Sequence, residues 1–254
     1  MKYEFKKSVD IGGRTINLLE GIAAIKTNRW LLMYLGTGEG LGPADGSEIL
    51  DLDNRGYQKY TTFETDFNIM APQAVKGYSE SDALIQDYMK RTYGQDIEIV
   101  MCGHSLGARN TMEFSYGYNG IKADPCVVGF MPVAGSISYP VPEDWCTAAD
   151  KPIMAFHGEN DGAIGKAQTI NYVTFLNTCA TRQHKAVARI IPGLDHNKIM
   201  EYVFKPDKTA EGYQFIMSCF SPDKKETRGT IFLNENGEVR ARFEDGSTRT
   251  IEAY

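Results

Sequence analysis

The sequence lacks any apolar stretch that approaches the roughly 20 residues needed by a membrane-spanning helix. Residues 1–10 are charged, and no apolar run follows them that would serve as a secretion signal. The chain also lacks a run of lysine or arginine, and its net charge is −6. A nucleic-acid partner requires a basic face, so we expect no such partner and no membrane span.

Cysteine is scarce, because the chain has 5 cysteines, an odd number, and they follow no regular spacing. Cys102, Cys126 and Cys219 stand in apolar surroundings, where a cysteine is usually a small buried hydrophobic residue. Reduced thiols and the missing signal predict a cytoplasmic protein, although a mature secreted form would look similar. No metal-ligand spacing is present, so we expect neither a metal nor a cofactor.

What the chain does have is a regular alternation of short apolar runs with helical patterns. An N-terminal pair of strands, within residues 3–19, precedes this alternation. The alternation predicts an α/β fold with a mostly parallel central sheet and helices on both faces. The predicted strands are 29–35, 67–71, 97–102, 126–133, 153–156 and 186–191, and the predicted helices are 79–93, 106–117, 166–179 and 209–220.

The domain organisation follows from where this alternation ends. Residues 1–225 are expected to form the main domain, in which the polar segment 41–62 is a lid or binding loop. Residues 226–254 change character and predict an antiparallel three-stranded meander, an appendage whose role the sequence leaves open, with docking or oligomerisation as one interpretation. Two hairpin signals, Asn236-Gly237 and Asp245-Gly246, separate its strand-like pieces.

The sharpest chemical motif is Gly103-His104-Ser105-Leu106-Gly107, which directly follows an apolar strand and opens a helical segment. Gly-x-Ser-x-Gly in this context is a nucleophile elbow, in which a tight turn leaves no room for side chains at either glycine. The serine then sits beside a helix N-terminus, which favours developing negative charge. Cys102 is a rival nucleophile, but its place inside an apolar strand disfavours it.

A serine hydroxyl needs a base to become a nucleophile at neutral pH. His196 follows the strand and loop at 187–195, which places it at the same carboxyl edge of the sheet as Ser105. We interpret the other histidines differently: His104 as local to the elbow, His157 as part of a turn, and His184 as a solvated loop residue. His196 is therefore the predicted base.

The base in turn needs an acid that holds its tautomer and stabilises the imidazolium. Asp161 lies just beyond the apolar strand at 153–156. Its rivals are Glu159, which comes too early in the turn, and Asp195, which is adjacent to His196 and poorly placed to reach its Nδ1. Asp161 is the predicted acid.

These motifs together resemble the α/β-hydrolase superfamily. The order Ser105, Asp161, His196 matches the order of the triad in that family, and the resemblance spans roughly residues 14–220 without the C-terminal meander. The short core and Ala71-Pro72-Gln73 are similar to compact esterases such as the dienelactone-hydrolase and polyhydroxybutyrate-depolymerase-like groups.

The resemblance also implies an oxyanion hole of two backbone N–H groups. One is that of Leu106, and the other comes from the loop after an early strand, with Thr37 as donor or Gly38 in its place. That family often has His-Gly at the start of this loop, where this chain has Leu35-Gly36.

The activity implied is that of a carboxylesterase-like serine hydrolase, which cleaves a small-molecule or polymer-linked ester through an acyl-enzyme. A thioesterase or acyltransferase, a serine peptidase, and a catalytically silent binding protein remain alternatives. Four aromatic residues are expected either to wall an acyl or aryl pocket or to pack the long loop onto the domain. They are Tyr57, Tyr60, Phe63 and Trp145.

Overall fold

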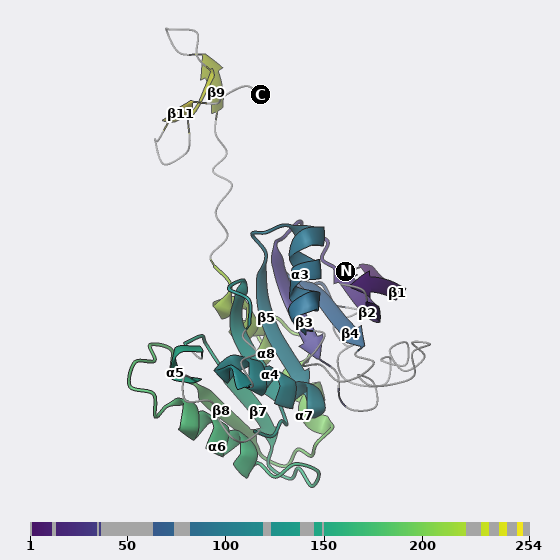
Figure 1. Cartoon of the computed structure of the whole chain (residues 1–254), viewed down its shortest axis with the longest axis vertical. Coiled ribbons are helices and arrows are strands. Elements are labelled where there is room, and N and C mark those ends of the chain that lie inside the picture. The colour runs from purple at the N-terminus through teal and green to yellow at the C-terminus, as the bar shows by residue number, and fades with distance from the viewer. Residues whose placement is uncertain are drawn as a thin grey trace. The chain divides into compact units, whose positions relative to one another are not determined.

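The structure is a computed structural model of the 254-residue chain, shown in Figure 1. Two compact units make up the chain, Met1–Phe220 and Ser221–Tyr254, and each is described by itself. The structure describes residues 2–11, 14–34, 36, 63–73, 82–118, 123–137, 145–148, 150–221, 230–233, 239–242 and 248–250.

The larger unit is built on an 8-stranded sheet with the order β1-β2-β4-β3-β5-β6-β7-β8 (Figure 1). The pairs β1–β2 and β2–β4 are antiparallel, and every pair from β4 through β3 to β8 is parallel. The mostly parallel sheet predicted from the alternating pattern is confirmed. The strands are β1 (Lys2–Ile11), β2 (Arg14–Ile22), β3 (Arg29–Tyr34), β4 (Asn68–Gln73), β5 (Glu98–His104), β6 (Val127–Val133), β7 (Met154–Gly158) and β8 (Val187–Ile191).

The helices lie between the strands in sequence, as a parallel sheet requires. Four of them match predicted helices, whereas α5 and α7 were missed, because 4 and 6 residues are too few to establish a helical period. The described helices are α3 (Asp82–Tyr93), α4 (Leu106–Tyr116), α5 (Trp145–Ala148), α6 (Ala167–Leu176), α7 (Lys198–Val203) and α8 (Glu211–Cys219).

Alternate residues of the central strands enter two separate cores. On β3, Leu32 and Tyr34 pack into the core formed with α3, α4 and α6. Leu31 and Met33, one residue out of step, pack into the core formed with α7 and α8. Because successive side chains of a strand point to opposite faces, a strand that is buried throughout shows that helices cover both faces of the sheet.

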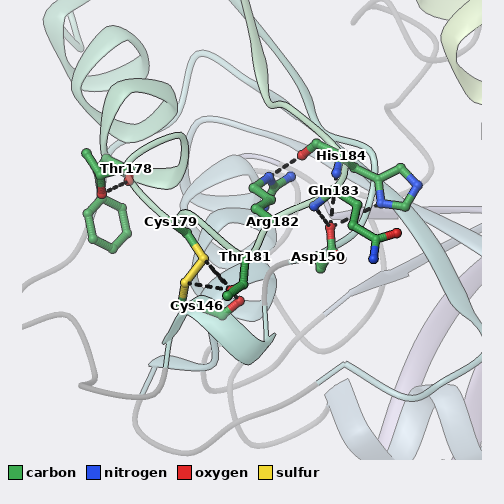
Figure 2. The surroundings of a disulfide bond; sticks show 9 residues. Cys146, Asp150, Thr178, Cys179, Thr181, Arg182, Gln183 and His184 are labelled. Carbon is green, nitrogen blue, oxygen red and sulfur yellow. Dashed lines mark hydrogen bonds and ion pairs between the residues drawn. A yellow bond between two sulfur atoms is a disulfide. The ribbon is translucent and has the colours of Figure 1, made fainter.

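A disulfide joins the segment before β7 to the segment before β8 (Figure 2). Cys146 on α5 bonds Cys179, with their Cα atoms 5.6 Å apart. Nearby, the Asp150 carboxylate accepts hydrogen bonds from the backbone N–H groups of Gln183 and His184, at 2.9 and 3.0 Å (Figure 2). The expectation that all the thiols are reduced is therefore wrong for one pair, which the irregular cysteine spacing did not reveal.

The smaller unit contains a 3-stranded sheet with the order β11-β10-β9. Both strand pairs are antiparallel, as in a meander, and Arg240 of the central strand pairs with Phe232 on one side and Thr250 on the other. The residues between these strands lie outside the described part of the chain. The strands are β9 (Thr230–Leu233), β10 (Val239–Arg242) and β11 (Thr248–Thr250).

Two further expectations concern the segment 41–62 and membrane-spanning helices. The segment 41–62, predicted as a lid or binding loop, lies in the part of the chain that the structure leaves undescribed. Among the helices that the structure describes, none has the length and apolar character needed to cross a membrane.

Candidate active site

Ser105 forms the turn between β5 and α4. Its φ of 56° and ψ of −115° lie outside the regions that a serine ordinarily adopts. The turn is held at both ends, because the Ser105 N–H donates to the Val133 carbonyl at 3.1 Å and its own carbonyl accepts from the Arg109 N–H at 3.0 Å. A serine in this strained position at the end of a central strand has the geometry of a nucleophile elbow.

The first glycine of the motif is required by the closeness of this turn. A Cβ atom on Gly103 would lie 2.3 Å from the carbonyl oxygen of Gly107, and real Cβ atoms do not approach a carbonyl that closely. Gly107 itself is buried within the first turn of α4. The backbone of the strand therefore meets the backbone of the helix directly, and this contact holds Ser105 at the tip of the turn.

Asp161 and His196 come from the loops after β7 and β8, at the same carboxyl edge of the parallel sheet as Ser105. The His196 Nδ1 lies 2.7 Å from Asp161 Oδ2. The Asp161 side chain is completely buried, whereas that of His196 is 18% exposed. The structure thus brings the predicted acid and the predicted base into direct hydrogen-bond contact.

The carboxylate of Asp161 is fixed by its own loop as well. Its Oδ1 accepts the backbone N–H groups of Ala163 and Ile164, at 2.9 and 2.8 Å. Burial raises the pKa of this carboxyl, but the N–H groups of Ile164 and Ala163 and the ring of His196 lower it by more. The net pKa lies below the ordinary value, so Asp161 is ionised at neutral pH and accepts the Nδ1 proton of His196.

The residue before the nucleophile connects the elbow to the base. The Nε2 of His104 lies 2.8 Å from the His196 carbonyl oxygen, and the two ring centroids are 4.6 Å apart. Within the described part of the chain, no hydrogen bond joins the Ser105 hydroxyl to the His196 ring. Catalytic hydrogen bonds of this kind tighten when substrate binds. His104, interpreted from sequence as local to the elbow, in fact contacts the loop of the predicted base.

The first predicted donor of the oxyanion hole, the Leu106 N–H, lies at the N-terminus of α4. Leu106 begins α4, so its N–H is among the first donors of the helix, which have no partner within the helix. The partial positive charge at this helix end favours a developing oxyanion there. Thr37 and Gly38, the predicted second donors, lie outside the described residues, so the second donor stays a prediction.

The rival nucleophile and the two rival acids considered from sequence are poorly placed for catalysis. Cys102 is fully buried within β5, and burial raises the pKa of its thiol well above the ordinary value, which keeps it protonated and unreactive. Glu159 forms an exposed ion pair with Lys166, at 3.3 Å. The carboxylate of Asp195 accepts the N–H of Lys198 at 2.8 Å, at the start of α7. Neither acid is bonded to the His196 ring, in contrast to Asp161.

The two described aromatic residues of the predicted pocket pack against the helices. Phe63 lies edge-on to Tyr213 of α8, with centroids 5.9 Å apart, and Trp145 lies 4.0 Å from Phe175 of α6. These are packing contacts of Phe63 and Trp145 themselves, and the role of the aromatic residues in the long loop stays a prediction. Tyr57 and Tyr60 lie outside the described residues.

Sequence reasoning missed a third histidine at this edge of the sheet. The buried ring of His157 lies with its Nε2 3.1 Å from Asp161 Oδ2, the same oxygen that contacts the His196 ring. The spacing of four residues in His157-Gly-x-x-Asp161 held the only signal, since a short turn after the end of β7 can bring these two side chains together. Within the described residues, no group of three or more His, Cys, Asp and Glu side chains is arranged to hold a metal ion.

The fold of this chain is similar to that of known proteins whose structures are solved. No protein-family model matches the sequence, and no curated protein matches it. Among solved structures, Est1E from Butyrivibrio proteoclasticus is similar with a TM-score of 0.57 and 13% identity, over 85% of this chain and 98% of that one. The esterase domain of a Rhodothermus marinus protein has a TM-score of 0.57 and 11% identity, over 81% and 95% of the two chains.

An α/β serine hydrolase homologue from Coxiella burnetii is also similar, with a TM-score of 0.51 and 11% identity, over 79% of this chain and 91% of that one. Identities this low establish the fold alone. Together with the strand order, these likenesses show that the chain has the α/β-hydrolase fold, as the sequence motifs predicted.

Proposed function

We propose that this chain is a serine hydrolase that cleaves a carboxylic ester, with Ser105 as nucleophile, His196 as base and Asp161 as acid. The observation that carries the proposal is the strained Ser105 turn, which lies beside the loop in which His196 is bonded to Asp161 at 2.7 Å. The fold adds support, because its solved neighbours include esterases. Fold likeness alone would not carry the proposal, since one fold hosts many functions.

The hydrogen bond to Asp161 selects the tautomer of the His196 ring. Because the ionised carboxylate accepts the Nδ1–H of His196, the proton of the neutral ring is on Nδ1 and the lone pair of Nε2 is free. That nitrogen takes the Ser105 proton as the serine oxygen attacks the ester carbonyl. The buried carboxylate then stabilises the imidazolium that forms.

The remaining steps follow from the same groups. The N–H of Leu106 donates to the oxyanion of the tetrahedral intermediate, together with the predicted donor at Thr37 or Gly38. His196 returns its proton to the leaving alcohol as the intermediate collapses to an acyl-Ser105. A water molecule, deprotonated by His196, then attacks the acyl carbonyl and releases the carboxylic acid and free Ser105.

Intact mass after treatment with a fluorophosphonate probe tests the nucleophile directly. We expect one phosphonyl adduct on the native chain and none on Ser105→Ala, because only an activated serine displaces fluoride. Cys102→Ala serves as the matched control and is expected to label like the native chain. If a folded native chain forms no adduct, or if Ser105→Ala still labels, the proposal is wrong.

Labelling alone does not distinguish an ester substrate from a thioester. Initial rates on a paired series, in which each acyl group is offered as its oxygen ester and as its thioester, make that distinction. We expect higher kcat/KM for the oxygen esters. A consistent preference for thioesters, or for transfer to an added amine or alcohol over water, would replace the esterase proposal by a thioesterase or an acyltransferase.

A further inference from the structure

His157 is the last but one residue of β7, and its ring is completely buried behind the predicted acid. Both ring nitrogens have partners. Nδ1 lies 2.8 Å from the hydroxyl of Thr169 on α6, and Nε2 lies 2.8 Å from the carbonyl oxygen of Ile164. The same Nε2 lies 3.1 Å from Asp161 Oδ2. A ring that served only to fill volume would not need polar partners on both sides.

These partners determine which nitrogen carries the proton. The Ile164 carbonyl can only accept a hydrogen bond, so the Nε2 of His157 must be the donor. In the neutral ring Nδ1 is then an acceptor, and the Thr169 hydroxyl, which is itself fully buried, donates a hydrogen bond to it. The Nε2–H therefore donates to the Ile164 carbonyl, while Nε2 itself also lies 3.1 Å from Asp161 Oδ2, and Thr169 stabilises this tautomer.

Asp161 Oδ2 consequently lies between two imidazole rings. The His196 Nδ1 approaches it at 2.7 Å, and the His157 Nε2 approaches it at 3.1 Å. Oδ1 is held separately by the N–H groups of Ala163 and Ile164. Rotation of the carboxylate about its Cβ–Cγ bond would break contacts on both oxygens, so its plane is fixed with Oδ2 toward the base.

We propose that His157 is a positioning residue of the active site, which orients the Asp161 carboxylate toward His196 and is itself oriented by the Thr169 hydroxyl. This inference rests on the proposed function, because it assigns Asp161 and His196 their catalytic roles. A solely structural His157 would satisfy the Ile164 carbonyl and fill space without affecting the bond between Asp161 and His196. The two roles therefore predict different effects on that bond.

Two substitutions of His157 separate these roles. His157→Phe keeps the ring volume and removes both nitrogens, whereas His157→Gln places an amide N–H near the position of Nε2. We expect His157→Phe to lower kcat by up to about 100-fold with KM unchanged, since a small displacement of a catalytic group can cost that much. His157→Gln should restore most of the lost kcat.

A spectroscopic readout makes the test independent of activity. The proton in the short hydrogen bond between His196 Nδ1 and Asp161 should give a far-downfield ¹H resonance, assigned by its loss in Asp161→Asn. We expect His157→Phe to broaden this resonance into exchange with water and His157→Gln to retain it. A folded His157→Phe that keeps both native kcat and the native resonance would overturn the proposal.

Thr169→Val keeps the proposal testable if His157→Phe does not fold. This isosteric change leaves the ring in place but removes the hydroxyl that fixes its tautomer, so we expect lower kcat and a broadened resonance. Ser115→Ala is the matched control, because it removes a buried hydroxyl bonded to Tyr172 Oη at 2.6 Å, away from Asp161. It should lower the Tm without changing the resonance. If Thr169→Val affects only the Tm, as Ser115→Ala does, His157 is structural.

The failure of this inference can be told apart from the failure of the proposed function. If the native chain is not labelled by the fluorophosphonate probe, the hydrolase proposal fails, and the resonance alone decides whether His157 orients Asp161. If the native chain is labelled but neither His157→Phe nor Thr169→Val changes kcat or the resonance, only the positioning role fails.

Discussion

Ser105 occupies a backbone conformation that costs a residue other than glycine about 1–3 kcal/mol. Ala134, at φ of 53°, is the other residue of this kind in the described part of the chain. It follows β6, the strand that lies beside β5, and its N–H donates to the Phe156 carbonyl at 2.8 Å. Both strained residues thus lie at the carboxyl edge of the sheet, where Asp161 and His196 also lie. The strain is local to the candidate site and is sustained by the packing around it.

Gly103→Ala tests how closely the strand and helix approach at the elbow. The added Cβ would lie 2.3 Å from the Gly107 carbonyl oxygen, a backbone atom that cannot move without shifting α4. We expect the free energy of unfolding to fall by about 3 kcal/mol and the Tm to fall by roughly 6–12 °C. Labelling of Ser105 should slow even in the fraction that stays folded, because the turn must open to admit the methyl group.

Gly165→Ala is the control for this substitution. A Cβ on Gly165 meets no atom within 4 Å, so we expect its Tm to stay close to that of the native chain. Thermal unfolding followed by circular dichroism measures both variants. Equal Tm values for Gly103→Ala and the native chain would contradict the close contact between Gly103 and Gly107.

At the scale of elements, the disulfide joins α5 to the segment that follows α6. Cys146 and Cys179 are 33 residues apart in sequence, so the bond removes loop-closure entropy from the unfolded chain. We expect reduction to lower the free energy of unfolding by about 3–4 kcal/mol. Ser105 should still be labelled in the reduced, folded protein, because α5 contributes none of the residues proposed for catalysis.

Thermal unfolding with and without a reductant measures this contribution. Cys146→Ser is the control, since it should match the reduced native chain and show no further change when reductant is added. Mass after alkylation under denaturing conditions, with and without prior reduction, counts the bonded thiols. A native chain with the same Tm in both conditions, or with five alkylated cysteines before reduction, would contradict the pairing.

The comparison of sequence with structure shows which elements a pattern can reveal. Each central strand was predicted because burial on both faces makes it apolar throughout, as on β3. The short helix α7 and the pairing of Cys146 with Cys179 were not predicted, because both depend on contacts between distant parts of the chain. The contacts of the His157 ring were missed for the same reason, since Thr169 and Ile164 reach it only in the folded chain.

For the candidate site, prediction succeeded where the chemistry is local. The glycines and Ser105 form one continuous motif, and their turn could be predicted from sequence alone. Asp161 could be ranked above its rivals only by its place after a strand, and the structure now gives its contact with His196. The second oxyanion donor depends on how one loop lies against another strand, which no pattern in residues 35–38 specifies.

At the scale of the whole molecule, folding changes the pKa values of carboxyl groups, which titrate in acid, and of thiols, which titrate in alkali. Burial raises the pKa of Asp124, but the Lys90 side chain and the Cys126 backbone N–H lower it by more, so the net pKa falls, as it does for Asp161. Burial raises the pKa of the Cys219 thiol to about 12. A carboxyl whose pKa is lowered by folding stabilises the fold at pH values above its pKa in the unfolded chain, about 3.9. A thiol whose pKa is raised by folding stabilises the fold at pH values below its pKa in the unfolded chain, about 8.5.

The free energy of unfolding should therefore be nearly constant around neutral pH and fall on both sides. On the acid side it should fall as pH drops below about 4, through the lowered pKa values of Asp124 and Asp161, since the unfolded carboxyls bind protons first. On the alkaline side it should fall between about pH 9 and 12, because the buried thiols of Cys102, Cys126 and Cys219 ionise first in the unfolded chain. Urea midpoints measured across this range give both slopes. Cys219→Ala should reduce the alkaline slope by up to about 1.4 kcal/mol per pH unit. It should leave the acid slope unchanged. An unaltered alkaline slope would show that folding does not raise the pKa of this thiol.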